Sequence, residues 1–228
     1  MWTPPTLTTM SFDERIEDVA GLRRLYADPH PVVKAKAIDH IDDGARAFLA
    51  RSSFAVLATS GPDGGDASPR GGPPGFAAVV DDQRLALGDL AGNRRLDSFE
   101  NVLANPRVGL IFMIPGMSES LRINGRACLT TDPEILDACA YDGTQPKVAL
   151  GVEVDEVYLH CAKAFRRSGL WDPASWPDAA DRPRAADIWK GHLDLDAPAD
   201  AIDADLEAGY AVTMWQAGGE DAPVRSPS

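Results

Sequence analysis

Six short apolar segments separated by turns, all between residues 53 and 161, constrain the fold of this chain most strongly. The segment 120–129 (SLRINGRACL) alternates between apolar and polar residues, which is the period of a β-strand with one buried face. The other segments have the lengths and turn boundaries of strands: 54–59, 76–80, 83–87, 108–114 and 148–161. No repeated strand–helix–strand unit is present. The pattern predicts a mainly β fold with flanking helices (α+β), in which about six antiparallel strands form a small barrel.

Helical segments are expected on both sides of these strands. Ser11 is a candidate N-cap with Glu14 three residues later, which predicts a first helix from near Phe12. Two more helical segments are predicted over 32–40 and 42–51, one helix after Asn93 is inserted in the strand order, and Asp132 precedes another short one. The chain is expected to have three parts: an N-terminal helical segment packing on the barrel (1–52), the barrel (53–176), and a partly helical C-terminal extension with a mobile end (177–228).

The charge balance excludes some partners. The formal net charge is −13, from 35 acidic against 22 basic residues, so the chain as a whole repels nucleic acid and anionic membranes. Three widely spaced cysteines with no CxxC pair indicate a reducing compartment, and the start lacks the plan of a signal peptide. No apolar run approaches the ~20 residues needed to span a bilayer. A cytoplasmic location is therefore predicted.

Arg94 and Arg95 stand where a helix is predicted to begin with Asn93 as its N-cap. Two cations in a first helical turn are unfavourable, because the N-terminal end of the helix dipole is already positive. A bound anion would offset this, and free backbone N–H groups, the dipole and two guanidinium groups together suit a phosphate. The alternative is that both arginines are solvated and pair with acidic neighbours such as Asp97. The pattern leaves both interpretations open.

Other cations could also meet a ligand. In the segment 67–75 (ASPRGGPPG), Pro69 disfavours a central strand, while the glycines after Arg70 let backbone approach a flat or charged ligand; a plain surface loop is the alternative. Arg122 lies on the polar face of a predicted strand and faces a cavity, a subunit interface or solvent. The segment HCAKAFRRSGLW supplies cations and an aromatic that could cover a ring system or form a solvated face around a core tryptophan: Lys163, Arg166, Arg167 and Trp171.

Metal and hydrolase chemistries find no support in the motifs. The four histidines are scattered without metal-ligand spacing: His30, His40, His160 and His192. No nucleophile elbow, P-loop or GxGxxG motif occurs. No metal site and no catalytic acid or base are predicted.

Four segments, taken in order, carry a resemblance to a known family: SPRGGPPGF, LGDLAGNRRLDSFENVLANPRVGLIF, PGMSESLRINGRA and HCAKAFRRSGLW. They resemble the pyridoxamine 5′-phosphate oxidase-like flavoproteins, and more narrowly a bacterial subgroup of FMN-dependent enzymes of unknown substrate. The resemblance covers about residues 15–175. It implies a split β-barrel at 53–176, a homodimer, and two FMN molecules in clefts between the subunits.

The resemblance also implies which residues bind the cofactor. The basic pair after Asn93 would bind the FMN phosphate, the strand from Ser68 to Gly71 would run beside the isoalloxazine ring, and residues 88 and 89 would contact the ring or ribityl chain. Ser120 would contact the ribityl chain or phosphate, with Arg122 next on that face. Lys163, Arg167 and Trp171 could come from the partner subunit. The full implied set is Ser68, Arg70, Gly71, Gly88, Asp89, Asn93, Arg94, Arg95, Ser120, Arg122, Lys163, Arg167 and Trp171.

The sequence departs from the family pattern in three places. Gly72 stands where the subgroup has Asp, Leu90-Ala91 replaces Arg-Pro, and the tail lacks the Arg-x-His signature of the authentic oxidases, which argues against oxidation of pyridoxine phosphate. Two functions of different class remain. One is an FMN-dependent oxidoreductase acting on an unidentified small molecule, in which hydride is exchanged with the flavin. The other is a carrier or sensor of flavin or haem on the same barrel, without turnover.

Overall fold

The computed structural model describes residues 12–218 in two compact units, which divide between Lys36 and Ala37. The first unit contains two short helices, α1 (Val19–Leu25) and α2 (Pro31–Ala35). The Asp18 carboxylate accepts a hydrogen bond of 2.6 Å from the backbone N–H of Gly21 and begins α1. The expected helix start near Phe12 is therefore wrong, and the expected cap Ser11 lies outside the described residues. No residue of α1 is buried, so no packing extends the helix toward earlier residues.

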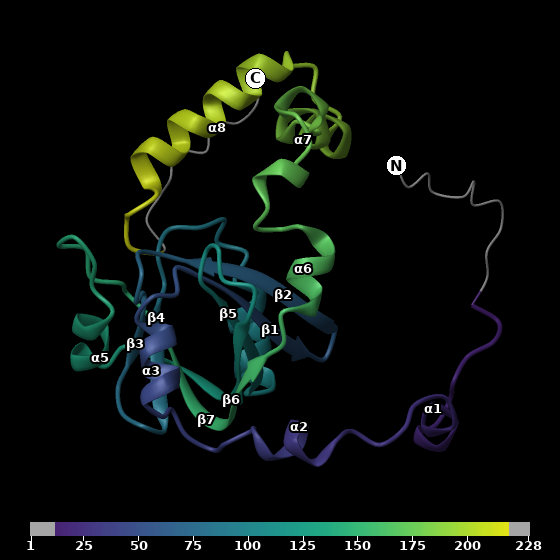
Figure 1. Cartoon of the computed structure of the whole chain (residues 1–228). Helices are drawn as coiled ribbons and strands as arrows, with labels where there is room; N and C mark the ends of the chain where they lie inside the picture. The colour runs from purple at the N-terminus through teal and green to yellow at the C-terminus, as the bar shows by residue number, and fades with distance from the viewer. Residues whose placement is uncertain (1–11, 219–228) are drawn as a thin grey trace. The chain divides into compact units, whose positions relative to one another are not determined.

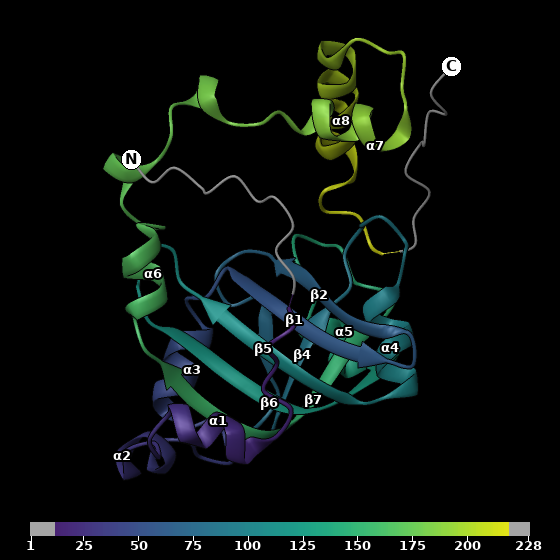
Figure 2. The same ribbon diagram turned by 90° about the vertical axis from the view of Figure 1, so that its right-hand side faces the viewer.

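The second unit is built on one curled antiparallel sheet (Figures 1 and 2). Its strands run in the order β2-β1-β5-β6-β7-β4-β3, and every neighbouring pair is antiparallel. The predicted fold class, a split barrel of antiparallel strands with flanking helices, is confirmed. The strands are β1 (Phe54–Gly61), β2 (Gly64–Gly71), β3 (Ala77–Val79), β4 (Arg84–Gly88), β5 (Arg107–Met113), β6 (Ser120–Thr130) and β7 (Ala149–His160).

The seventh strand, absent from the predicted six, is β2. It forms a hairpin with β1, in which Pro69 lies opposite Val56, and it is the first strand in the sheet order. An edge strand tolerates a proline, because one side of its backbone needs no ladder hydrogen bond. Pro69 therefore correctly indicated that this segment is not a central strand. The segment is an edge strand, which the sequence pattern did not predict.

The core lies inside the curl of the sheet. Leu57, Leu110, Phe112 and Ile123 are at most 1% exposed and come from three neighbouring strands. The helix α3 (Asp43–Leu49) begins at its N-cap Asp42 and adds Phe48 and Leu49 to the same cluster. Each such side chain contributes about 1.5–3 kcal/mol by leaving water, so this cluster is the main source of stability for the unit.

Two helices interrupt the strand order. α4 (Asp97–Ala104) lies between β4 and β5, and α5 (Pro133–Ala138) lies between β6 and β7 with the expected Asp132 as its N-cap. The remaining helices follow β7: α6 (Lys163–Ser168), the 3-10 turns η1 (Pro173–Ser175) and η2 (Ala179–Asp181), α7 (Ala185–Leu193) and α8 (Ala199–Thr213). Within residues 12–218, no helix has the length and apolar character needed to cross a membrane.

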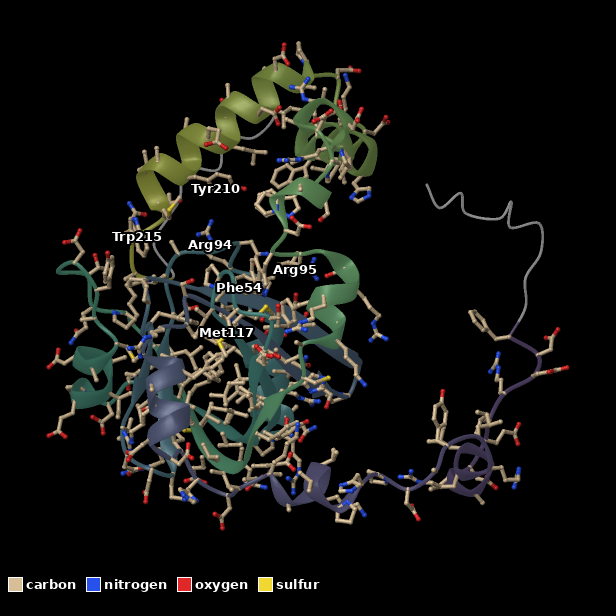
Figure 3. The ribbon with its side chains drawn as sticks, viewed as in Figure 1. Phe54, Arg94, Arg95, Met117, Tyr210 and Trp215 are labelled. Atoms are coloured by element: carbon tan, nitrogen blue, oxygen red, sulfur yellow. The ribbon has the colours of Figure 1, made fainter. Side chains whose placement is uncertain are left out.

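The chain beyond α8 returns to the sheet. The N–H of Ala91 donates to the carbonyl of Gln216 at 2.9 Å, and the N–H of Gly218 donates to the carbonyl of Asp89 at 3.0 Å. The Trp215 ring, at the end of α8 in Figure 3, lies 4.9 Å from the Tyr141 ring. We call residues 215–218 the return segment; it pairs with the chain immediately after β4.

Candidate functional site

A cavity of about 700 Å³ opens between β2, the end of β4 and the start of α4. Its wall includes the loop 89–96, which contains Arg94 and Arg95 (Figure 3). The volume is in the range of sites that hold cofactors. Eight of the residues implied by the family resemblance line this one cavity: Ser68, Arg70, Gly71, Gly88, Asp89, Asn93, Arg94 and Arg95.

One face of β2 supplies the polar side chains of the cavity. Asp66, Ser68 and Arg70 are half-buried, while the residues between them are exposed. This alternation is the period of a strand, so the three side chains point to the same side. Across from them, the first turn of α4 presents Ser98 and Phe99, both buried. A carboxylate, a hydroxyl and a guanidinium therefore follow one another along a single wall.

Arg70 is held in the cavity without full hydrogen bonding. Its Nη1 lies 3.7 Å from Oδ1 of Asp89, and its guanidinium carbon lies 5.4 Å from the centroid of the Phe99 ring. Its Nε is buried and has no hydrogen-bond partner among the described residues. Burial lowers the pKa of Arg70 against the opposing effect of Asp89, and burial raises the pKa of Asp89 against that of Arg70. Desolvation therefore outweighs the attraction within the pair.

The loop before α4 has an unusual backbone. Arg94 (φ 58°) and Leu96 (φ 60°) both lie in the left-handed region, which costs roughly 1–2 kcal/mol for each non-glycine residue. The Asn93 side chain accepts a hydrogen bond from the N–H of Arg95 at 3.1 Å and closes a turn. Such turns expose several backbone N–H groups on one concave side, an arrangement that suits an anion. Strain of this kind is frequent at binding sites.

The predicted helix start is wrong at this loop. α4 begins at Asp97 with Leu96 as its N-cap, so Arg94 and Arg95 precede the helix and its first turn holds acidic residues. The left-handed residue 96 breaks the helical path that Asn93 would have capped. Nε of Arg95 donates to Asp97 at 2.7 Å, as the alternative interpretation expected. A guanidinium has five N–H donors, and this contact uses the one on Nε.

A short chain of hydroxyl groups links β2 to α4. Oγ of Ser98 donates to Oδ2 of Asp66 at 2.6 Å, and Oγ of Ser98 and Oγ of Ser68 are 2.9 Å apart. Asp66 and Ser98 are functional candidates that sequence reasoning missed. The i, i+2, i+4 spacing of residues 66, 68 and 70 could have indicated Asp66, but Ser98 is brought in by tertiary packing and left no sequence signal.

The other implied residues lie outside this cavity as the described chain forms it. Arg122, on β6, stacks its guanidinium 5.2 Å from the Tyr158 ring, and its buried Nε has no partner among the described residues; the neighbouring Ser120 is buried. Lys163 and Arg167 are on α6. Trp171 stacks on Phe165 with ring centroids 5.9 Å apart and donates from Nε1 to the carbonyl of Met117 at 2.8 Å.

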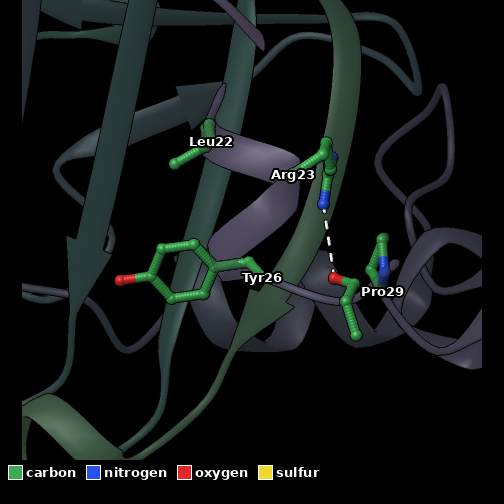
Figure 4. Close-up of a pocket in the computed structure, with 5 residues that line it drawn as sticks. Leu22, Arg23, Tyr26 and Pro29 are labelled. Carbon is green, nitrogen blue, oxygen red and sulfur yellow. Dashed lines mark hydrogen bonds between the residues drawn. The ribbon is translucent and has the colours of Figure 1, made fainter. Parts of the chain in front are cut away.

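A second hollow, of about 340 Å³, lies within the first unit (Figure 4). It is lined by residues on and after α1, and Arg23 donates to the carbonyl of Ala27 across it at 3.4 Å. Its lining is Leu22, Arg23, Tyr26, Ala27 and Pro29. This set has no carboxylate, thiol or hydroxyl nucleophile besides the Tyr26 phenol, so we assign it no chemistry.

The fold and cavity define a class: a split-barrel protein with a ligand-sized site, lined by three arginines and three aspartates, between an edge strand and an inserted helix. Residues 41–161, more than half of the chain, match the family model for pyridoxamine 5′-phosphate oxidase. The chain belongs to this family, and the match spans the whole sheet and the cavity.

The individual relatives share little sequence identity with this chain. The chain is 27% identical over 197 residues to a pyridoxine/pyridoxamine 5′-phosphate oxidase of Rubrobacter xylanophilus, covering 76% of this chain and 85% of the relative. Among solved structures, HupZ of Group A Streptococcus has a TM-score of 0.42 and 15% identity, over 52% of this chain and 93% of that one. General stress protein 26 of Bacillus anthracis has a TM-score of 0.40 and 14% identity, over 50% of this chain and 88% of that one.

Proposed function

We propose that this protein binds FMN in the cavity of β2, β4 and α4 and acts as an FMN-dependent oxidoreductase on an unidentified small molecule. The single observation that carries the proposal is the gathering of three arginines on this cavity in a chain of net charge −13: Arg70, Arg94 and Arg95. Three aspartates line the same cavity, so the arginines favour an anion at the loop 93–95, where two of them are adjacent, and not over the whole cavity: Asp66, Asp89 and Asp97. Membership of the family supplies the class of cofactor.

The phosphate end is assigned to the loop 93–95. A doubly charged phosphate can accept hydrogen bonds from both guanidinium groups and from the backbone N–H groups of the strained turn. Arg95 would share its guanidinium between Asp97 and the phosphate, since Nε already donates to the carboxylate. This assignment gives a reason for the left-handed backbone at Arg94, whose cost the bound anion would offset.

The residues present fit the polar remainder of the cofactor. The buried Nε of Arg70 has no hydrogen-bond partner within residues 12–218, and a carbonyl or hydroxyl oxygen of a ligand would complete its hydrogen bonding. Ser68 and Asp89 add further polar groups at the same wall. Phe76 and Leu87 add apolar surface of the kind that suits a flat ring.

The flavin, when bound, would supply the hydride transfer itself. The chain's own residues would hold the phosphate, orient the ring through Arg70 and keep water from its covered side. The described residues around the cavity include no histidine or thiol, and its carboxyl groups already contact Ser98, Arg70 or Arg95, so no catalytic residue is assigned. Purified protein is expected to be yellow and to be bleached by NADH or NADPH. A yellow protein that neither reductant bleaches would contradict the oxidoreductase part and favour a carrier.

A homodimer with FMN at the subunit interface is part of the same proposal. Lys163, Arg167 and Trp171 lie on or just after α6, away from the cavity of their own protomer as described. The partner subunit would then bring these two cations and the tryptophan to the cofactor.

The phosphate assignment is tested by replacing Arg94 and Arg95 together with alanine. FMN affinity is expected to fall by about 1.5–3 kcal/mol for each charged hydrogen bond lost, while riboflavin, which lacks the phosphate, keeps its affinity. Titration of flavin fluorescence measures both ligands. Arg84→Ala and Arg182→Ala, at exposed arginines outside the cavity, are the matched controls and should change neither affinity. Equal losses for FMN and riboflavin in the double variant would contradict the assignment.

A further inference from the structure

The hydroxyl chain between β2 and α4 has a direction. Ser98 is 4% exposed and donates its only hydroxyl hydrogen to the Asp66 carboxylate, at the short distance of 2.6 Å. A carboxylate has no hydrogen to give, and hydrogen bonds to charged acceptors are the stronger kind. The direction of this first bond is therefore set by chemistry.

The second bond follows from the first. Oγ of Ser98 and Oγ of Ser68 are 2.9 Å apart, and one of them must donate. Since the hydrogen of Ser98 is committed to Asp66, Ser68 donates to Ser98. The hydroxyl of Ser68 is then left with lone pairs alone, on a residue that lines the cavity.

We propose that Ser68 is a specificity-determining residue that accepts a hydrogen bond from a donor group of the ligand, a ring N–H or a ribityl hydroxyl, and that Ser98 and Asp66 fix this polarity. The proposal rests on the proposed flavin site and deepens it. A ligand that places an acceptor oxygen against Ser68 cannot form a hydrogen bond there, because both oxygens then present lone pairs and neither has a hydrogen to donate. The neighbouring Arg70 has the opposite polarity, since a guanidinium only donates.

The two side chains thus form an ordered pair on one strand face. Arg70 presents donors, and Ser68, two residues earlier on β2, presents an acceptor. A flat ring edge that carries a carbonyl beside an N–H matches such a pair, whereas a ring edge with carbonyls only does not. Asp66 acts through Ser98 in this proposal, so it is a positioning residue.

Flavin analogues in wild-type protein and in Ser68→Ala test the proposal. Riboflavin should bind about 2–10-fold more weakly to the variant, the range that follows from the net contribution of one hydrogen bond. Lumiflavin, which lacks the ribityl chain, separates the two donors. If lumiflavin weakens as well, the donor is the ring N–H, and a methyl group on that nitrogen should abolish the difference between the two proteins. If only riboflavin weakens, the donor is a ribityl hydroxyl.

Variants at Ser98 test the polarity. In Ser98→Ala the hydroxyl hydrogen of Ser68 is released and can turn toward the ligand, so an analogue that offers an acceptor in place of the donor should bind about 2–10-fold more tightly than to wild type, while riboflavin, whose donor Ser68 still accepts, should keep its affinity. Ser98→Thr keeps the hydroxyl and should bind both ligands as wild type does. Ser60→Ala on β1, whose hydroxyl accepts from Asn105 outside the cavity, is the matched control.

The outcomes separate this inference from the proposed function. If wild-type protein binds neither FMN nor riboflavin, the flavin site itself fails. If it binds both and Ser68→Ala changes no affinity, the flavin site stands and the acceptor role of Ser68 is overturned. Tighter binding of riboflavin to Ser68→Ala, in a variant whose circular dichroism matches wild type, would also overturn it.

Discussion

Arg70 and Asp89 form a partly buried ion pair on the cavity wall that is costly to desolvate. The two groups are 3.7 Å apart and largely buried, and for both of them burial is the larger influence on the pKa. A pair held at this distance without full hydrogen bonding is a poor stabiliser of the fold. Under the proposed function, its position on the cavity wall accounts for its presence better than stability does, since the buried Nε of Arg70 has no partner among the described residues and can donate to a ligand.

The raised pKa of Asp89 predicts a pH dependence of stability. The folded state binds this proton more tightly than the unfolded state, so the contribution of Asp89 is present at low pH and is lost as the pH rises through its folded-state pKa. Asp89→Asn should therefore gain stability relative to wild type as the pH rises through that range. Urea unfolding from about pH 4 to about pH 7 measures the difference.

Asp81→Asn is the control of opposite sign. A hydrogen bond from Arg84 lowers the pKa of this exposed carboxyl, so its contribution is lost as the pH falls. The variant should lose stability relative to wild type as the pH rises from about pH 2.5 to about pH 4.5, on the acidic side of the range used for Asp89. A trend of the same sign in both variants would contradict the assigned burial of Asp89.

At the scale of elements, the return segment connects the C-terminal helices to the cavity. It pairs by two backbone hydrogen bonds with residues 89–91, which belong to the cavity wall. Gly218 is buried, and a Cβ at this position would overlap the Asp89 carboxylate and lie 3.0 Å from its backbone oxygen. The glycine is therefore required by the close approach of two backbones.

Gly218→Ala is expected to loosen the loop 89–95. Overpacking of this kind costs about 1–3 kcal/mol, and relief requires the return segment to move away. Hydrogen exchange of the Ala91 amide, which donates to Gln216, should become faster, and FMN should bind more weakly. Gly191→Ala in α7, where a Cβ meets no atom within 4 Å, is the control and should be neutral or slightly stabilising. Unchanged exchange at Ala91 in Gly218→Ala would show that the contact is not restrictive.

At the scale of the whole molecule, the proposed site requires a second copy of the chain. Sedimentation should give a mass twice that of the 24.4 kDa chain. Lys163→Glu/Arg167→Glu should weaken FMN binding, although neither residue lines the cavity of its own protomer. Lys190→Glu on α7 is the control for a change of charge alone. A monomer that binds FMN normally, or full affinity in the double variant, would contradict a site shared between subunits.

The amino-acid sequence by itself determined the local features of this protein. The alternation of 120–129 and the apolar runs around it fix strands and their buried faces, because the side-chain period of a strand is two. The arginine pair and the turn residues before it are consecutive in the chain, so they are close together whatever the fold.

Only the tertiary structure decided which side chains meet. The contacts of Ser98 with Asp66, Arg70 with Asp89, and Ala91 with Gln216 join residues far apart in the chain, and they depend on strand order, strand register and the curl of the sheet. The helix start was wrong for the same reason, since packing of Ser98 and Phe99 against β2 sets where α4 begins. Local propensity is worth a few tenths of a kcal/mol to about 1 kcal/mol per residue, and such packing overrides it.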